Sequence, residues 1–220
     1  MNHSPTAAGP GPDQLVLASA SPARAALLRG AGIEPVIHVS HVDEEAELAA
    51  HAPSTVAASV QVLARAKARA VAAELAPATP SAPAAPLVLG CDSLLEFEGQ
   101  ALGKPQTPER AIQRWRRIRG RSGVLHTGHH LCAGGGQSGG VSSTRVHFAE
   151  VTDAEIEAYV ATGEPLHVAG AFTIDGYGGA FITSIEGDHH GVIGLSLPLL
   201  RELLPQVGYS WVQLWACSQP

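Results

Sequence analysis

Three features are scarce in this sequence of 220 residues, and each scarcity excludes a class of protein. Cysteine occurs only at positions 91, 132 and 217, too sparsely for a disulfide framework or a Cys/His metal cluster. Only 14 Lys and Arg stand against 20 Asp and Glu, and the net charge of -6 argues against a nucleic-acid partner. No apolar run reaches the roughly 18 residues of a membrane helix, and residues 1–12 lack the apolar core of a signal peptide. We therefore expect a cytoplasmic protein that binds neither nucleic acid nor membrane.

Familiar catalytic patterns are missing as well. The sequence has no Gly-x-Ser-x-Gly elbow of a serine hydrolase, and its glycine-rich stretches lack the Gly-Lys-Ser/Thr ending of a P-loop. The pairs His129-His130 and His189-His190 are adjacent, and neighbouring side chains on a strand point in opposite directions, so these pairs are poor zinc chelators. Carboxylates, lysines and arginines are the remaining candidates for chemistry.

The length and the hydrophobic content of 45% are sufficient for one domain with a substantial core. We place this domain at residues 14–208, between a flexible segment at 1–13 and a tail at 209–220. Strand patterns that alternate with helical patterns, together with one hairpin, predict an α/β fold with a mixed sheet.

Apolar periodicity and capping residues give the expected elements. Strands are predicted at residues 14–18, 33–40, 87–91, 94–97, 124–133, 141–148 and 180–185. Helices are predicted at residues 22–30, 54–75, 108–118 and 198–204, and after a Thr152/Glu155 capping box. The glycine-rich residues 134–140 are expected to form a flexible hairpin loop, and the Pro/Ala tract 76–86 an exposed connection.

The first candidate site is the turn from the first strand into the first helix. Unpaired N–H groups at a helix N-terminus favour anions, and Arg24 with the hydroxyl of Ser19 adds further donors for phosphate. An equally plausible interpretation is that Ser21 only caps the helix and that Arg24 is solvated.

Lys67 is a second candidate, because it falls in the middle of the apolar stripe of the long predicted helix, between Leu63 and Val71. A lysine can extend past the edge of a core to reach water. Its central position favours a bound phosphate or a carboxylate partner instead.

Asp92 follows an apolar strand, where open α/β sheets place their ligands, and partial burial would bring its pKa towards that of a general base. The simpler alternative is that it caps the strand with Ser93. Lys104 lies between Gly103 and Pro105, which would aim its side chain or leave it as an exposed turn residue. Glu44 and Glu45 belong to an acidic run that is normally a solvated face, but one of them could hold Mg²⁺ or Mn²⁺ together with Asp92.

Several separated motifs occur together in the order typical of one family. They are Leu-Ala-Ser-x-Ser-Pro-x-Arg at 17–24, Val-Asp-Glu at 42–44, Lys-Ala at 67–68, Asp-Ser at 92–93, Gly-Lys-Pro at 103–105, Gly-Glu-Pro at 163–165, Ala-Gly-Ala-Phe at 169–172 and Val-Ile-Gly-Leu at 192–195. This pattern covers most of the chain and resembles the Maf family of nucleotide pyrophosphatases.

The resemblance implies two α/β lobes around a central groove, as in house-cleaning inosine triphosphatases, and often a homodimer. It implies cleavage of a nucleoside triphosphate into the monophosphate and pyrophosphate with the help of a divalent metal. The implied roles are a proton acceptor and metal ligand (Asp92), a second metal ligand (Glu44), and substrate-binding residues (Ser19, Arg24, Lys67, Ser93, Lys104 and Asp175).

Three positions depart from the family branches of known substrate preference. At the position of Ala23, one branch has arginine and the other has tryptophan. At the positions of Ser93 and Asp175, the branch with arginine has threonine and glutamine, respectively. The base therefore stays unassigned. Two other functions are open: a nucleotide-binding regulator of cell division that does not cleave, and a monophosphate phosphatase.

Overall fold

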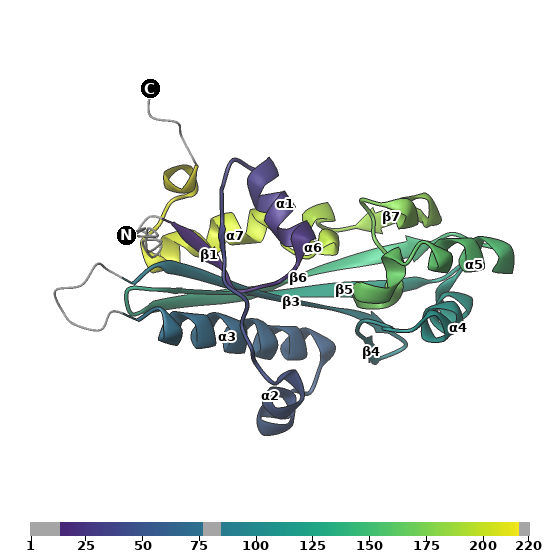
Figure 1. The fold of residues 1–220 in the computed structure, drawn as a ribbon, viewed down its shortest axis with the longest axis horizontal. Coiled ribbons are helices and arrows are strands. Elements are labelled where there is room, and N and C mark those ends of the chain that lie inside the picture. Colours follow the sequence, from purple (N-terminus) through teal and green to yellow (C-terminus); the bar gives the residue numbers. More distant parts are fainter. Residues whose placement is uncertain (1–13, 77–84, 216–220) are drawn as a thin grey trace, which may run out of the picture.

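The computed structural model describes residues 14–76 and 85–215, and the predicted α/β fold with a mixed sheet is confirmed (Figure 1). One sheet has the strand order β2-β1-β3-β5-β6-β7, and β4 pairs with β3. Its strands are β1 Leu15–Leu17, β2 Val36–Ile37, β3 Leu87–Phe97, β4 Gln100–Leu102, β5 Ser122–Ala133, β6 Gly136–Phe148 and β7 Ile182–Glu186. The helices are α1 Pro22–Gly30, α2 Glu44–His51, α3 Val56–Glu74, α4 Pro108–Ile118, α5 Asp153–Ala161, α6 His189–Ile193 and α7 Leu197–Leu203.

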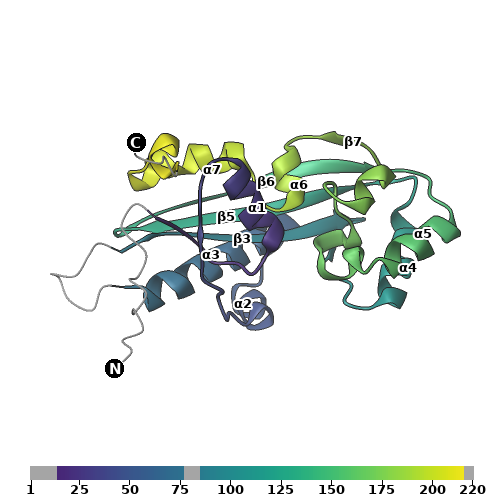
Figure 2. The ribbon, with the colours of Figure 1, turned by 45° about the horizontal axis from the view of Figure 1, so that its top comes forward.

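The helices cover the sheet on both faces (Figures 1 and 2). Helix α3 lies along one face, and α1, α6 and α7 lie over the other, while α4 and α5 pack at the far end. Short 3₁₀ turns connect and follow these elements, at Glu164–His167, Ala169–Ala171, Tyr177–Phe181, Leu204–Val207 and Trp211–Leu214.

Strand β3 is paired continuously on one edge and only at its two ends on the other. Antiparallel β5 pairs with it from Val88 to Glu96. On the opposite edge, parallel β1 pairs with residues 87–89 and antiparallel β4 with residues 95–97. Residues 90–94 therefore have no strand partner on that edge within the described part of the chain.

Two large apolar cores lie at opposite ends of the long strands. One surrounds β1, α1 and α7 and includes Leu17, Leu28 and Leu200. The other surrounds Trp115 of α4, whose ring meets those of Phe148, Tyr159 and Phe181 edge-on. The two predicted lobes correspond to these cores. Buried polar residues lie between them on the shared strands, namely Asp92, Thr127 and His129.

Helix α3 approaches the sheet so closely that two positions beneath it require glycine. A Cβ atom on Gly90 would lie 2.2 Å from the carbonyl oxygen of Ala64, and one on Gly128 would lie 2.3 Å from that of Val60. The helix backbone thus rests directly on β3 and β5. This contact fixes the height and position of α3 over the centre of the sheet.

Two predicted elements differ from the structure, and two helices were not predicted. The flexible loop at 134–140 is wrong: only Gly134 and Gly135 form the turn, and Gly136–Phe148 is a strand. Both turn residues have positive φ (50° and 95°), which a two-residue hairpin requires and glycine supplies. The strand at 33–40 shrinks to β2, which pairs on one side only. Two helices were not predicted, α2 with its N-cap Asp43 and the short α6.

Other predictions hold, including the Ser21 cap of α1, the extent of α3 and the Thr152/Glu155 capping box of α5. Residues 1–13, residues 77–84 of the expected connection and residues 216–220 of the tail lie outside the described residues.

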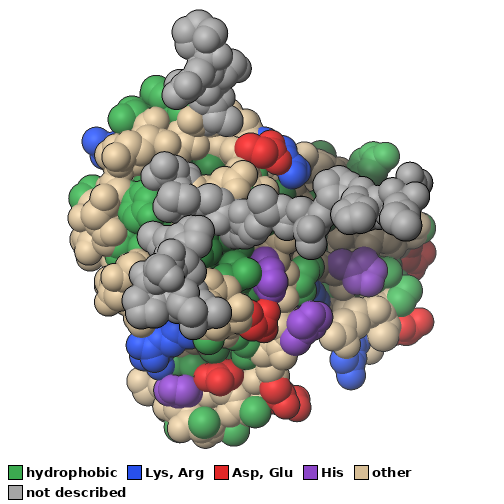
Figure 3. All heavy atoms as spheres, turned by 60° about the vertical axis from the view of Figure 1, so that its left-hand side comes forward, with side chains coloured by type: hydrophobic (Ala, Val, Ile, Leu, Met, Phe, Trp, Pro, Cys, Tyr) green, Lys and Arg blue, Asp and Glu red, His purple; other side chains and the backbone are tan. Residues whose placement is uncertain are grey.

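None of the described helices combines the length and apolar content needed to cross a bilayer. On the face shown in Figure 3, Lys and Arg side chains are scattered rather than gathered into one basic patch.

The close approach of α3 gives a stability prediction. Replacing Gly90→Ala should lower the free energy of unfolding by about 3 kcal/mol, because the new methyl group collides with the α3 backbone. Gly30→Ala is the matched control, since its methyl group meets no atom within 4 Å. Urea unfolding of both variants measures the difference. Equal stabilities would mean that the helix does not sit where the structure places it.

Candidate active site

Asp92 lies in the middle of β3, which corrects the expectation that it ends a strand. The strand continues because β5 pairs along its whole length, with Asp92 opposite Gly128. On the other edge β1 stops at Leu17, and in the described part of the chain no strand pairs with β3 beside Asp92. A break in strand pairing, rather than a strand end, creates the site.

The ammonium group of Lys67 lies between two carboxylates. Its Nζ is 2.6 Å from Oδ1 of Asp92 and 2.7 Å from Oε1 of Glu44. The Lys67 and Asp92 side chains are 13% and 11% exposed, whereas Glu44, on the first turn of α2, is 54% exposed. The lysine in the apolar stripe of α3 thus has the carboxylate partner that its position indicates, and it does not extend to water.

Burial raises the pKa of the Asp92 carboxyl above its usual range, and the nearby positive charges of Lys67 and Arg24 oppose the shift. A raised pKa makes the carboxylate a stronger base than an exposed aspartate. The neighbouring thiol of Cys91 is different: burial raises its pKa to about 12, so it stays protonated and inert.

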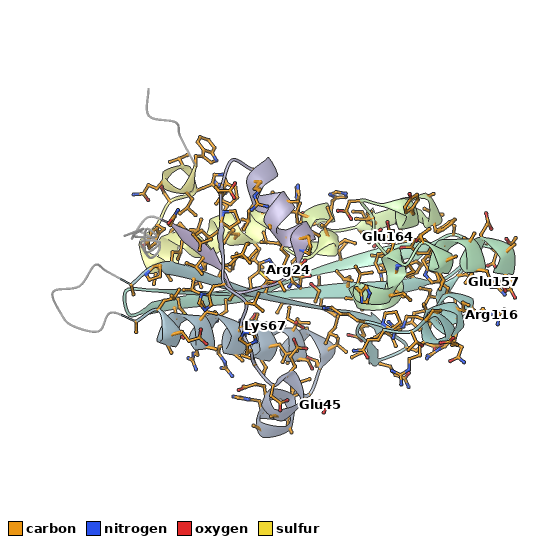
Figure 4. All side chains as sticks on the ribbon, in the orientation of Figure 1. Arg24, Glu45, Lys67, Arg116, Glu157 and Glu164 are labelled. Atoms are coloured by element: carbon orange, nitrogen blue, oxygen red, sulfur yellow. The ribbon has the colours of Figure 1, made fainter. Side chains whose placement is uncertain are left out.

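Arg24 of α1 reaches the same stretch of β3 from the opposite face (Figure 4). Its guanidinium donates to the carbonyl oxygen of Gly194 (2.7 Å), to Oγ of Ser19 (2.9 Å) and to Oγ of Ser93 (3.0 Å). The alternative of a solvated arginine is therefore wrong. Three bonds from three separate segments hold the group beside the first turn of α1.

Two buried residues that the sequence interpretation missed support this arginine. The Ser93 hydroxyl lies 2.8 Å from Oγ1 of Thr127, which in turn donates to the carbonyl of Gly191 at 2.8 Å. His129 accepts a hydrogen bond from the backbone N–H of Ser196 at 2.8 Å, and burial lowers its pKa to about 4, so the ring is neutral. The available signal was the spacing of two between these polar residues, which places both side chains on the same face of the strand.

Two predicted residues stand outside this hydrogen-bonded group. Lys104 is exposed, and within the described part of the chain no carboxylate pairs with it. The preceding Gly103 packs near Leu94, two residues from Asp92. Asp175 is exposed in the loop after Phe172, where it lines a cavity together with Ala23. The structure therefore brings together Ser19, Arg24, Glu44, Lys67, Asp92 and Ser93, and leaves Lys104 and Asp175 apart from them.

The donor set near Asp92 fits a hard cation better than zinc. No three His, Cys, Asp or Glu side chains among the described residues converge closely enough to hold a metal. Glu44 and Asp92 do converge, because both contact the same Lys67 nitrogen. Two carboxylates are a usual protein contribution to a Mg²⁺ site that takes its other ligands from phosphate and water.

Comparison with known proteins assigns the family. The family described as "Maf: Maf-like protein" matches residues 14–207, so the chain belongs to the Maf family. Proteins named nucleoside triphosphate pyrophosphatase from Salinispora tropica and Nocardia farcinica are each 54% identical over 207 residues. The alignments cover 93% and 91% of this chain and 88% and 96% of those relatives.

Two further matches are more distant. A protein of the same name from Gloeothece citriformis is 49% identical over 203 residues, covering 91% of this chain and 97% of the relative. The solved structure of the Staphylococcus aureus Ham1 protein aligns with a TM-score of 0.40 at 14% identity, over 62% of this chain and 72% of that one. That likeness is too low to indicate function.

The Lys67 pair gives a titration prediction. In a Lys67→Met variant, the pKa of Asp92 should rise further, because burial remains while the neighbouring positive charge is lost. Carbon-detected NMR titration of the Asp92 carboxyl measures this shift. Arg69→Met serves as the control, since Arg69 bonds Gln137 at the surface instead. A pKa that stays constant or falls in Lys67→Met would contradict the observed contact.

Proposed function

We propose that this protein hydrolyses a nucleoside triphosphate to the monophosphate and pyrophosphate. The observation that carries the proposal is the buried Asp92 carboxylate flanked by Lys67 and Arg24 at an open edge of β3. Relatives that cover nearly the whole chain bear the name of this activity. A polyanion needs cations, and a water nucleophile needs a base; this edge supplies both.

Each residue then has a distinct task. Arg24 binds phosphate oxygens, with the guanidinium already oriented by Ser19 and Ser93. Lys67 neutralises charge that develops on the transferred phosphoryl group. Lys104, exposed in the segment between β4 and α4, adds a further cation when substrate is present.

Asp92 accepts the proton of the attacking water. The water oxygen forms a bond to the α-phosphorus, the bond from that phosphorus to the bridging oxygen breaks, and pyrophosphate leaves with the electron pair. The raised pKa of Asp92 makes its carboxylate a stronger base than an exposed aspartate. Phosphate contact with Lys67 competes with its bond to Asp92 and so frees the carboxylate for this role.

Glu44 and Asp92 are the residues that would hold a divalent cation, Mg²⁺ or Mn²⁺. When bound, the cation supplies positive charge against the phosphate oxygens. The resemblance to the Maf family also supports a house-cleaning role in the cytoplasm and assembly as a homodimer, which we include in the proposal.

The base has a direct test. Asp92→Asn should lower kcat/KM for pyrophosphate release by about 10²–10⁴-fold, because an amide cannot accept the proton. Asp153→Asn is the matched control, since Asp153 is 51% exposed and pairs with Arg116 and Arg119. Pyrophosphate and orthophosphate are detected separately. Full activity in Asp92→Asn would refute the assigned base, and orthophosphate as first product would indicate a phosphatase. Nucleotide binding without any product would indicate a regulator.

Metal removal tests the role of Glu44. Treatment with EDTA should abolish turnover, and Mg²⁺ or Mn²⁺ should restore it. Glu44→Gln should raise the Mg²⁺ concentration needed for half-maximal rate, because one anionic ligand is lost. Glu45→Gln, one residue further along α2, is the control. Turnover that persists in EDTA would remove the metal from the mechanism.

A further inference from the structure

A cavity of about 330 Å³ lies beside Arg24 on the α1 face of the sheet. Ala23, which immediately precedes Arg24, forms part of its wall, and His190 forms another part. The N–H of Gly194 donates to the carbonyl of His190 at 3.1 Å, and the carbonyl of Gly194 accepts from Arg24 at 2.7 Å. The cavity and the phosphate-binding arginine thus share one short turn.

The walls of this cavity suit a flat ring. Helix α1 contributes the small residues Ala23, Ala26 and Gly30, which leave space along one side, and Leu197 adds an apolar surface. The planar imidazole of His190 lies in the wall, with Nδ1 3.3 Å from Oδ1 of Asp188. Small apolar walls and one planar side chain can stack on an aromatic heterocycle.

Asp175 contributes a carboxylate to the wall of this cavity. Hydrogen bonds to residues before and after it hold its loop in place. The carboxylate of Glu164 (Figure 4) accepts from the Thr173 hydroxyl and from the backbone N–H groups of Tyr177 and Gly178, both at 3.0 Å. These contacts flank Asp175 in sequence. Among the described residues, nothing pairs with the Asp175 carboxylate itself, which leaves both of its oxygens available to a ligand.

We infer that this cavity receives the nucleobase and that Asp175 selects a guanine-type base. The inference rests on the proposed function. An ionised carboxylate only accepts hydrogen bonds, so it favours a base edge that presents two neighbouring donors. Guanine presents N1–H beside its 2-amino group. Uracil and thymine present one N–H between two carbonyl oxygens, which repel a carboxylate, and adenine and cytosine present an amino group beside a ring-nitrogen acceptor.

Initial rates with GTP, ITP, ATP, CTP and UTP test the selection. We expect kcat/KM for GTP to exceed that for UTP by about tenfold or more, which is the usual discrimination by one two-bond contact. ITP, which lacks the 2-amino group, should fall between them. A preference for UTP, or equal rates with GTP and ITP, would overturn the inference.

Substitutions of cavity residues test whether the preference for guanine arises in this cavity. Asp175→Asn should reduce the ratio of kcat/KM for GTP to that for UTP by about tenfold. Glu202→Gln, a similar change on the exposed side of α7, should leave the ratio unchanged. Ala26→Leu should raise KM for all five substrates, because the larger side chain narrows the cavity. If kcat/KM for GTP and for UTP change by the same factor in Asp175→Asn, the ratio is unchanged and Asp175 is refuted as the selecting group.

The two proposals fail in different ways. Pyrophosphate release from UTP in preference to GTP would refute the base selection and leave the hydrolytic function standing. If no triphosphate yields pyrophosphate, the proposed function fails, and calorimetric titration with GTP and UTP then decides the cavity. Tighter binding of GTP, lost in Asp175→Asn, would still support the base site, and equal binding would refute it.

Discussion

The close packing of α3 on the centre of the sheet is the constraint on which the rest of the structure depends. Gly90 and Gly128 let the helix backbone rest on β3 and β5, so a side chain on the sheet-facing side of α3 has no room to turn away. Lys67 is on that face and extends to Asp92. A buried ion pair costs much of its attraction in lost hydration, and apolar residues of similar size would pack at least as well. The pair is therefore better explained by chemistry than by stability.

Two faces of one strand meet at this site. Asp92 and Ser93 are adjacent and point to opposite sides of the sheet, so Lys67 and Arg24 approach from α3 and α1 respectively. In a fully paired sheet these groups would be separated by backbone. Because β3 has no partner strand at 90–94 on one edge within the described residues, the polyanion that we propose as substrate would have access to both groups there. The gap between β1 and β4 is what turns two separate contacts into one site.

Local patterns predicted the parts of this arrangement that depend on nearby residues. The helical period of α3 placed Lys67 on the buried face, and Ser21-Pro22 located the start of α1. What depends on strand pairing could not be predicted. Asp92 looked like a strand end because Asp-Ser pairs often end strands through local hydrogen bonds, but pairing with β5 carries the strand on past Asp92 to Glu96. The glycine-rich residues 136–140 were expected to be flexible, yet they belong to strand β6. The motif order of a family supplied Glu44, which no periodicity indicated.

The hydrogen bonds that fix the Arg24 guanidinium affect how strongly it can stabilise bound phosphate. A cation gives its full electrostatic effect only if it does not have to reorganise when substrate binds. Arg24 is bonded to Ser19, Ser93 and the carbonyl of Gly194, and the next residues are anchored by His129 through the N–H of Ser196. Since the pKa of His129 is lowered to about 4, its ring keeps the free electron pair that this bond needs at neutral pH. The turn thus stays fixed under the conditions in which we propose that Asp92 accepts a proton, and the same turn carries the wall of the adjacent cavity.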